Sequence, residues 1–304
     1  MTYGHQGNKS SENAHNDATK PAEPSTTRPR VKRLSVPEIM AKKGKSKIVV
    51  LTAYTESVAR AIDPFVDIAL VGDSLGMVLY GDDSTLSVSL DTMIRHGKTV
   101  VNATKQALVV VDMPFASYQA SPEQAFSAAA KVMAESGCQA IKIEGGKVMA
   151  PTVAFLVERG IPVMGHVGML PQSVNIAGGF RARGLGVGAM GDEERRIIHQ
   201  DAKAIADAGV FSMVIEAISA KLATEITQNI AVPTIGIGAS DQCDGQVLVT
   251  EDMAGLTRAP SPRFVKRYAE LGELLAQAAA DYAHEVRTGE FPSQNQFYRG
   301  KGDY

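Results

Sequence analysis

Eight short, almost wholly apolar segments recur along the chain, and between them apolar residues return at helical spacing. Continuous apolar runs of this length are typical of parallel strands whose outer faces are covered by helices. The predicted strands span residues 48–53, 66–72, 108–112, 140–144, 162–166, 212–216, 234–238 and 246–250. The alternation of strands and helices therefore predicts an α/β fold with a parallel sheet.

The two kinds of connection between these elements differ. Three predicted helices end in a glycine directly before a strand, which is typical of a tight turn with a left-handed cap residue. These glycines are Gly137, Gly160 and Gly209. The connections from strand to helix are longer and more polar, especially 73–90, 112–121 and 167–191. This asymmetry predicts a single (β/α)8 TIM barrel with its functional site at the C-terminal ends of the strands.

A doubly wound sheet is the structural alternative. Its dinucleotide-binding form requires the pattern G-x-G-x-x-G directly after a strand and before a helix. Residues 236–241 follow a predicted strand but lack the third glycine, and the glycine-rich stretch 184–188 follows no strand. We therefore exclude a dinucleotide site.

The predicted barrel domain covers residues 35–290. Residues 1–34 are polar and have no hydrophobic period, so we expect a disordered tail; residues 291–304 form a C-terminal tail. Order begins at the capping box Ser35-Val36-Pro37-Glu38, which starts a short helix to about Lys43. The last predicted helix, 262–288, carries one apolar stripe and is expected to pack on the outside of the barrel. The stripe consists of Phe264, Tyr268, Leu271, Leu275 and Ala278.

Composition narrows the classes of partner and compartment. The chain has 304 residues, of which 44% are apolar and 21% charged, with a formal net charge of −2. Near-neutral charge argues against nucleic acid or an anionic membrane as the main partner, and no run of about 18 apolar residues exists to span a bilayer. Two cysteines, Cys138 and Cys243, are too few for a disulfide framework and suit a reducing compartment.

Ionisable residues stand at the ends of several predicted strands. A single aspartate at such a position commonly only caps the next helix, and this explanation is preferred for any one of them. When successive strands each end this way, however, the side chains meet at one mouth of the barrel. The residues are Asp73, Asp112, Lys142, Glu144, His166 and Glu216.

The segment Ile141-Lys142-Ile143-Glu144 is the most informative of these. Side chains alternate along a strand, so the lysine and the glutamate share one face. Because the isoleucines belong toward the helices, the two charges point into the barrel mouth, where burial is costly unless they are paired or bind a ligand. A structural ion pair is one explanation. With Asp73 and Asp112 nearby, the surplus of negative charge also predicts a bound cation.

Mg²⁺ suits a small site of carboxylate oxygens best, and Mn²⁺, Co²⁺ or Zn²⁺ can replace it. We expect Asp73 and Asp112 to be direct ligands, with Glu144 binding either directly or through a water. Such an ion can chelate a 2-oxo acid and polarise its carbonyl group. Lys142 and Ser74 are then placed to contact the bound anion.

Two residues from later strands complete the candidate site. Glu216 is the candidate base for removal of the proton next to the carbonyl. His166 has two interpretations, a structural histidine with satisfied hydrogen bonds or a contact to the substrate.

Nine stretches carry a resemblance to a known family. They are LTAY at 51–54, VGDSLGM at 71–77, DSTL at 83–86, DMPF at 112–115, SPEQA at 121–125, KIEGG at 142–146, GHVG at 165–168, PQSVN at 171–175 and GIGA at 236–239. Together, and in this order, they resemble the ketopantoate hydroxymethyltransferases of pantothenate (coenzyme A precursor) biosynthesis. The likeness covers about residues 35–290.

The resemblance implies transfer of a one-carbon unit from 5,10-methylenetetrahydrofolate to 3-methyl-2-oxobutanoate, giving 2-dehydropantoate and tetrahydrofolate. It implies a divalent metal, Mg²⁺, bound by Asp73, Asp112 and Glu144. It also implies that Asp73, Ser74, Asp112 and Lys142 contact the oxo acid and that Glu216 is the catalytic base. A cytoplasmic decamer, built as a pentamer of dimers, is implied as well.

The chain departs from the family pattern after Gly178-Gly179. A Val-Gln-Gly-like segment is usual there, whereas this chain reads Phe180-Arg181-Ala182-Arg183-Gly184. Two alternative functions stay open beside the transferase. One is a Mg²⁺-dependent lyase or mutase of a pyruvate-like acid, which need not recognise folate. The other is a non-catalytic barrel that binds a small acid, which would bind its ligand without proton exchange.

Overall fold

The computed structural model describes residues 32–257, 261–298 and 300. Eight parallel strands close into a barrel in which each strand pairs with its neighbours in chain order and β8 pairs with β1. The strands are β1 (Ile48–Thr52), β2 (Ile68–Val71), β3 (Leu108–Asp112), β4 (Ala140–Glu144), β5 (Val163–Gly168), β6 (Ser212–Glu216), β7 (Thr234–Ile237) and β8 (Gly245–Leu248). The predicted (β/α)8 barrel is therefore confirmed.

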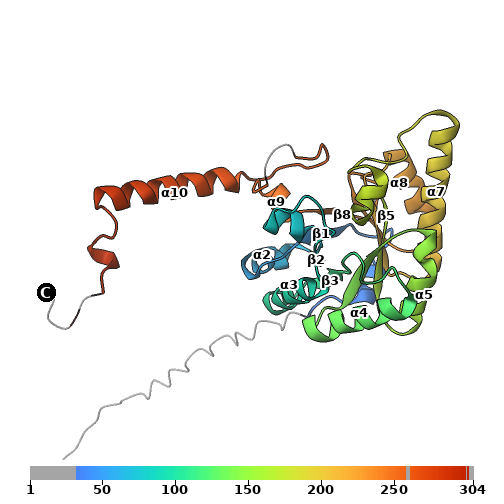
Figure 1. The fold of residues 1–304 in the computed structure, drawn as a ribbon, viewed down its shortest axis with the longest axis horizontal. Coiled ribbons are helices and arrows are strands. Elements are labelled where there is room, and N and C mark those ends of the chain that lie inside the picture. The colour runs from blue at the N-terminus through green and yellow to red at the C-terminus, as the bar shows by residue number, and fades with distance from the viewer. Residues whose placement is uncertain (1–31, 258–260, 299, 301–304) are drawn as a thin grey trace, which may run out of the picture. The chain divides into compact units, whose positions relative to one another are not determined.

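Helices surround the strands and pack on one another around the barrel (Figure 1). They are α1 (Val36–Met40), α2 (Glu56–Ile62), α3 (Leu90–Ala103), α4 (Pro122–Ser136), α5 (Ala150–Glu158), α6 (Val174–Ala177), α7 (Gly188–Asp207), α8 (Ala220–Asn229), α9 (Thr250–Met253) and, beyond the barrel, α10 (Leu271–Thr288). Short turns of other helical types are η1 (Asp63–Phe65), the π-type η2 (Gly76–Tyr80), η3 (Lys147–Met149), η4 (Pro171–Ser173) and η5 (Gln294–Gln296).

Two apolar cores hold this arrangement together. The outer core lies between strands and helices and includes Ile141 and Ile143 of β4. The inner core fills the barrel and includes Ala140 of β4, together with Ile39 of α1. Because β4 contributes alternate residues to the two cores, Lys142 and Glu144 follow Ala140 on the inner face, as the alternation predicts.

The N-terminal helix packs against the N-terminal ends of the strands, because its buried Ile39 belongs to the inner core with Ile48 and Ile68, the first residues of β1 and β2. Its start carries the predicted capping interaction, in which the Ser35 amide donates to the Glu38 carboxylate at 2.8 Å. Just before it, the Arg33 guanidinium donates to the carbonyls of Ala107 and Thr104, each at 2.6 Å. These bonds satisfy carbonyls at and beyond the end of α3. Of the tail predicted to be disordered, 1–34, residues 1–31 lie outside the described residues, and the Leu34 amide donates to the Gln106 carbonyl at 2.8 Å.

The glycines at the turns from helix to strand have the predicted left-handed conformation. Gly137, Gly160 and Gly209 all have positive φ angles, between 79° and 93°, a conformation that costs glycine little. Five strands differ from their predicted bounds by one or two residues at one or both ends: β1, β2, β5, β7 and β8. At the C-terminal side of the barrel, β5 continues two residues past His166, because Val167 and Gly168 pair with Ile215 and Glu216 of β6.

The prediction for the last helix is wrong in its start and its packing. The helix begins at Leu271 rather than 262, because the amides of Tyr268 and Leu271 donate to the carbonyls of Met253 and Ala254 at the end of α9. None of its residues is buried. Its apolar side chains, Leu274 and Leu275 among them, lie exposed in this chain. Among the described residues, no helix is long and apolar enough to cross a membrane.

Candidate active site

The barrel brings the predicted ionisable residues together at the C-terminal ends of β2 to β6. Asp73 follows β2, Asp112 ends β3, Lys142 and Glu144 lie on β4, and His166 and Glu216 belong to β5 and β6. Strand register pairs Asp112 with Lys142, Glu144 with His166, and Gly168 with Glu216. All except Glu216 are buried, and the Glu216 side chain is 14% exposed. The crowding expected at this mouth is therefore present.

Asp112 is the central acceptor of the cluster. Its Oδ2 lies 3.0 Å from Lys142 Nζ and accepts a hydrogen bond from the Asp73 backbone amide at 3.2 Å. These contacts join β2, β3 and β4 at one point. The ion pair of Lys142 is with Asp112 and not with Glu144, the partner that the structural explanation had named: no contact within 4.0 Å joins the Lys142 and Glu144 side chains among the described residues.

His166 connects this acidic group with Glu216. Its Nδ1 lies 3.4 Å from Lys142 Nζ and 3.6 Å from Glu144 Oε1, and its Nε2 lies 3.1 Å from Glu216 Oε2. Burial and the positive charge of Lys142 lower the pKa of His166 below its usual value. The imidazole is therefore neutral near pH 7 and adds no second cation to the cluster.

The backbone around Glu216 requires two unusual conformations. A Cβ atom at Gly168 would lie 2.3 Å from the Glu216 carbonyl oxygen, and the φ angle of Gly168 is 101°. Ala217, directly after Glu216, has a φ of 47°, which is rare for a residue with a side chain. The glycine lets the end of β5 approach the backbone of β6 closely, and the strained residue lies directly after Glu216 at the mouth of the barrel.

Gln172, to which the sequence analysis assigned no role, links two of the carboxylates. From η4 its amide side chain donates to Asp73 Oδ2 at 2.8 Å and its backbone amide donates to Glu144 Oε2 at 3.0 Å. Its Oε1 accepts from the Tyr118 hydroxyl at 2.6 Å. The side chain is buried. The family-like stretch at 171–175 was the only signal for this residue, because no spacing relates a loop residue to strand ends far away in sequence.

A second link joins the loop after β2 to β1. The Tyr54 hydroxyl lies 2.8 Å from the Ser74 hydroxyl, and Ser74 follows Asp73 in the chain. Burial raises the pKa of Tyr54 well above its usual range, so the phenol stays protonated. Ser74 is therefore held beside Asp73 with its hydroxyl oriented by a neutral partner.

The cluster holds three buried carboxyl groups and a single lysine. Burial acts to lower the pKa of Lys142, and the charges of Asp112, Glu144 and Asp73 act to raise it. The carboxylates have the larger combined effect, so the pKa of Lys142 is raised. Burial and the nearby charge of Asp73 raise the pKa of Asp112 to about 7, and the same two causes raise that of Glu144. Three buried carboxyl groups thus share one lysine, an arrangement that a bound cation would relieve.

The donor set fits a hard divalent cation that keeps other ligands. Asp112 Oδ1 and Glu144 Oε1 are buried and have no hydrogen-bond partner in the described part of the chain. Within residues 32–257 and 261–298, no three His, Cys, Asp or Glu side chains are arranged to hold a metal together. Mg²⁺ commonly takes only one or two carboxylates and completes its shell with water and substrate, so the site is compatible with it.

A further buried carboxyl, Glu251, lies at the start of α9 and was not predicted. It is 6% exposed, and its Oε2 has no hydrogen-bond partner in the described segments. Burial raises its pKa to about 7, with a smaller contribution from Asp252. Its charge also acts on Tyr54, which contacts Ser74.

Glu251 is expected to make folding stability fall between about pH 4.5 and 7. The folded carboxyl keeps its proton up to about pH 7, whereas the unfolded one loses it near pH 4.3, so the folded state binds more protons in this window. Glu251→Gln is permanently neutral and should raise the free energy of unfolding by on the order of 2 kcal/mol at pH 8. At pH 4.5 the gain should vanish.

Urea unfolding at both pH values measures this difference. Glu135→Gln, a change at an exposed carboxyl of α4, is the matched control and should have little effect at either pH. An equal stabilisation by Glu251→Gln at pH 4.5 and pH 8 would contradict the assigned ionisation.

Solved structures of low sequence identity share the fold. A phosphonopyruvate hydrolase complex with oxalate and Mg²⁺ aligns with a TM-score of 0.56 at 11% identity, covering 89% of this chain and 93% of that one. A 2,3-dimethylmalate lyase of the PEP mutase/isocitrate lyase superfamily aligns with a TM-score of 0.53 at 16% identity, covering 85% and 89%. These likenesses support the barrel architecture.

Relatives named for a single activity are much more similar in sequence. The 3-methyl-2-oxobutanoate hydroxymethyltransferase of Rhodospirillum centenum is 56% identical over 270 residues, which cover 89% of this chain and 96% of that enzyme. The Brucella canis and Sphingopyxis alaskensis enzymes of the same name are 57% and 53% identical over 270 residues. A sequence model of the family Ketopantoate hydroxymethyltransferase matches residues 33–294. The chain therefore belongs to the ketopantoate hydroxymethyltransferase family and is a hydroxymethyltransferase enzyme.

Proposed function

We propose that the protein transfers a hydroxymethyl unit from 5,10-methylenetetrahydrofolate to 3-methyl-2-oxobutanoate, giving 2-dehydropantoate for the pantothenate pathway. The observation that carries this proposal is the convergence of Asp73, Asp112, Glu144 and Lys142 at one mouth, with Glu216 linked to them through His166. Such a site binds an anionic oxo acid beside a divalent cation and has a base within reach.

We assign Mg²⁺ to this site, with Asp73 and Asp112 as direct ligands and Glu144 binding either directly or through a water. The unpartnered oxygens of Asp112 and Glu144 support this assignment, and the phosphonopyruvate hydrolase with the same fold is described with Mg²⁺ and oxalate. When bound, the ion supplies a Lewis acid that makes the C3 proton of the oxo acid easier to remove.

The residues of the chain then have separate tasks. Lys142, the cation of the cluster, pairs with the carboxylate of the oxo acid, and Ser74 donates its hydroxyl to the same anion. Glu216 accepts the C3 proton. His166, neutral and with its Nε2 3.1 Å from Glu216 Oε2, is a positioning residue that lies against this carboxylate.

The atoms of the reaction balance with one water. The C3–H bond breaks, its proton goes to Glu216, and the resulting enolate carbon attacks the methylene carbon of the folate-derived iminium ion. A carbon–carbon bond forms, the bond from this carbon to the folate nitrogen breaks, and the water oxygen becomes the new hydroxyl group. The donor leaves as tetrahydrofolate: N10 gains a proton when the iminium ion forms, the second hydrogen of the water goes to N5, and the proton that Glu216 releases balances the one taken up at N10.

Proton exchange in D₂O tests this function in two stages. Incubation of the protein with 3-methyl-2-oxobutanoate and Mg²⁺ should replace the C3 proton with deuterium, followed by NMR. Addition of 5,10-methylenetetrahydrofolate should then yield 2-dehydropantoate. Exchange without product would favour a lyase or mutase of a related acid, and oxo-acid binding without exchange would favour the non-catalytic alternative.

We further propose the cytoplasmic decamer of the family, a pentamer of dimers. The exposed apolar side chains of α10, which no described residue of this chain buries, support contacts with further copies. Sedimentation equilibrium tests this assembly through the mass of the particle, expected at ten times the 32.2 kDa of one chain.

A further inference from the structure

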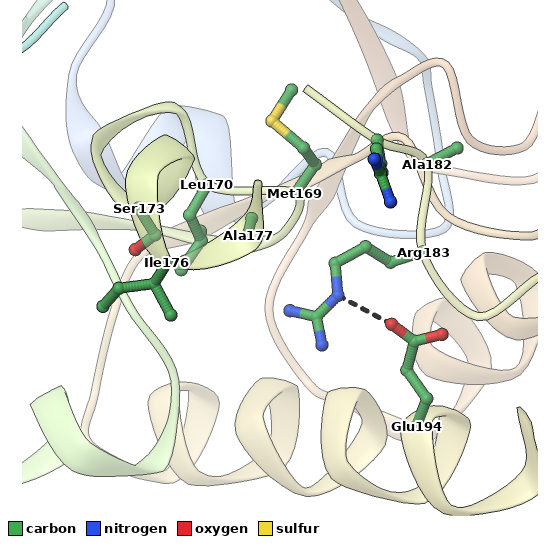
Figure 2. Close-up of a pocket in the computed structure, with 9 residues that line it drawn as sticks. Met169, Leu170, Ser173, Ile176, Ala177, Ala182, Arg183 and Glu194 are labelled. Carbon is green, nitrogen blue, oxygen red and sulfur yellow. Dashed lines mark hydrogen bonds and ion pairs between the residues drawn. The ribbon is translucent and has the colours of Figure 1, made fainter. Parts of the chain in front are cut away.

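A cavity of about 510 Å³ opens beside the candidate active site, and none of the site residues assigned above lines it. Its volume is in the range of pockets that bind small organic ligands. One wall comes from the end of β5, η4 and α6, and the opposite wall from residues 181–183 and the first turns of α7. Figure 2 shows Leu170, Ile176 and Ala177 on one side and the Arg183–Glu194 pair on the other.

Backbone hydrogen bonds place this cavity directly against Glu216. The amide of Met169, which lines it, donates to the Glu216 carbonyl at 2.9 Å. The amide of Arg183, on the opposite wall, donates to the Ala217 carbonyl at 2.7 Å. One wall of the cavity is therefore hydrogen-bonded to the backbone of Glu216, the proposed proton acceptor, and the other wall to the backbone of Ala217, the next residue.

The η4 wall also borders the acidic cluster. Gln172 lies between the lining residues Leu170 and Ser173, and it contacts Asp73 and Glu144. A ligand in the cavity is therefore separated from the oxo-acid site by this short turn and by the end of β6. A two-substrate reaction needs a second subsite in this position, with its reacting atom close to that of the first substrate.

The lining suits a flat heteroaromatic ring that has a polar edge. Ile176 lines the cavity and is 95% exposed, so its side chain is not covered by this chain. Glu194 accepts hydrogen bonds from Arg183 Nε and from the Gly184 amide, each at 2.9 Å, and a carboxylate retains further lone pairs for a ligand. Burial acts to raise the pKa of Glu194, but these bonds lower it below its usual value.

We propose that this cavity is the subsite for the one-carbon donor, a reduced pterin carried on an anionic glutamate tail. This inference rests on the proposed function, which supplies the donor. The ring packs against Leu170 and Ile176, and Glu194 accepts the N–H groups of its amino-pyrimidinone edge. Arg181, which lines the cavity and forms no ion pair with the described residues, meets the carboxylates of the tail.

Calorimetric titration with tetrahydrofolate, in the presence of Mg²⁺ and 3-methyl-2-oxobutanoate, tests this assignment without turnover. Glu194→Gln removes the charged acceptor and should weaken binding about 10–100-fold. Ile176→Ser should weaken it about tenfold, because an apolar contact is lost. Ile176 makes no part of the Arg183–Glu194 network, so the two variants probe the cavity independently.

Two matched controls lie outside the cavity. Glu193→Gln changes the neighbouring residue of α7, which pairs with Arg196 instead. Val148→Ser changes another strongly exposed apolar side chain, in η3. Both should bind tetrahydrofolate like the parent protein.

The outcomes separate this inference from the function on which it rests. If the parent protein binds tetrahydrofolate and both cavity variants bind it equally well, the subsite assignment is wrong and the proposed function stands. If the parent protein binds no tetrahydrofolate, the proposed function and the subsite both fail. Weakened binding in the cavity variants alone supports the assignment.

Discussion

Replacement of Glu216 by glutamine is expected to slow exchange of the C3 proton by about 10²–10⁴-fold, the usual contribution of a positioned general base. Glutamine keeps the size of the side chain and its contact with His166, which lies 3.1 Å from Glu216 Oε2 in the parent protein. It cannot accept a proton. Binding of the oxo acid and of Mg²⁺ should change little, because Lys142, Ser74 and the aspartates remain.

NMR of the exchange in D₂O and calorimetry of oxo-acid binding measure these two effects separately. Glu225→Gln is the matched control, since Glu225 is a half-exposed carboxyl on α8 that lies near Lys221 and contacts no residue of the proposed site. Exchange by Glu216→Gln at the rate of the parent protein would remove this residue from the base position. A matching loss of binding and exchange would instead assign it to substrate recognition.

The repeating pattern of apolar segments was sufficient to predict the barrel. Three strands, at 108–112, 140–144 and 212–216, have the predicted bounds. All three end in a charged residue that points inward, so the apolar run and the strand stop together. At β5 the run was followed by Val167 and Gly168, whose pairing depends on the neighbouring strand, and the predicted end came two residues early.

The acidic mouth could be predicted for a related reason. Parallel strands in a barrel have all their C-terminal ends on one side, so residues distant in sequence had to meet once the topology was known. Pairing within the mouth could not be predicted. Lys142 contacts Asp112 of the adjacent strand rather than Glu144 of its own strand, because residues two apart on a strand lie side by side and a register partner is closer.

The remaining features arise from tertiary contacts that have no local pattern. Gln172 reaches two carboxylates from a loop, and its neighbours in sequence give no periodicity that identifies it. Glu251 begins a short helix, where an acidic residue is ordinary at the sequence level, and only its burial distinguishes it. Of the stripe predicted for the last helix, Phe264 and Tyr268 precede the helix, and amphipathicity does not specify which surface covers the rest.

Replacement of Asp112 by asparagine is expected to weaken Mg²⁺ binding by more than about 100-fold. Loss of a residue that only hydrogen-bonds to a metal ligand costs roughly 10–100-fold, and loss of a direct ligand should cost more. Asp112 Oδ1 has no hydrogen-bond partner in the described part of the chain, whereas Oδ2 accepts from Lys142 and from the Asp73 amide. Asparagine keeps one acceptor but loses the charge, so Lys142 is shared by two carboxylates instead of three. Asp91→Asn, at the exposed partner of Lys131, is the matched control.

Thermal unfolding supplies a readout of Asp112→Asn that does not depend on turnover. A ligand that binds only the folded state raises the melting temperature with its concentration, so Mg²⁺ should stabilise the parent protein and Asp91→Asn alike. The same Mg²⁺ concentrations should leave the melting temperature of Asp112→Asn almost unchanged. A full Mg²⁺-dependent shift in that variant would remove Asp112 from the ligand set and leave Asp73 and Glu144 as the carboxylates that hold the ion.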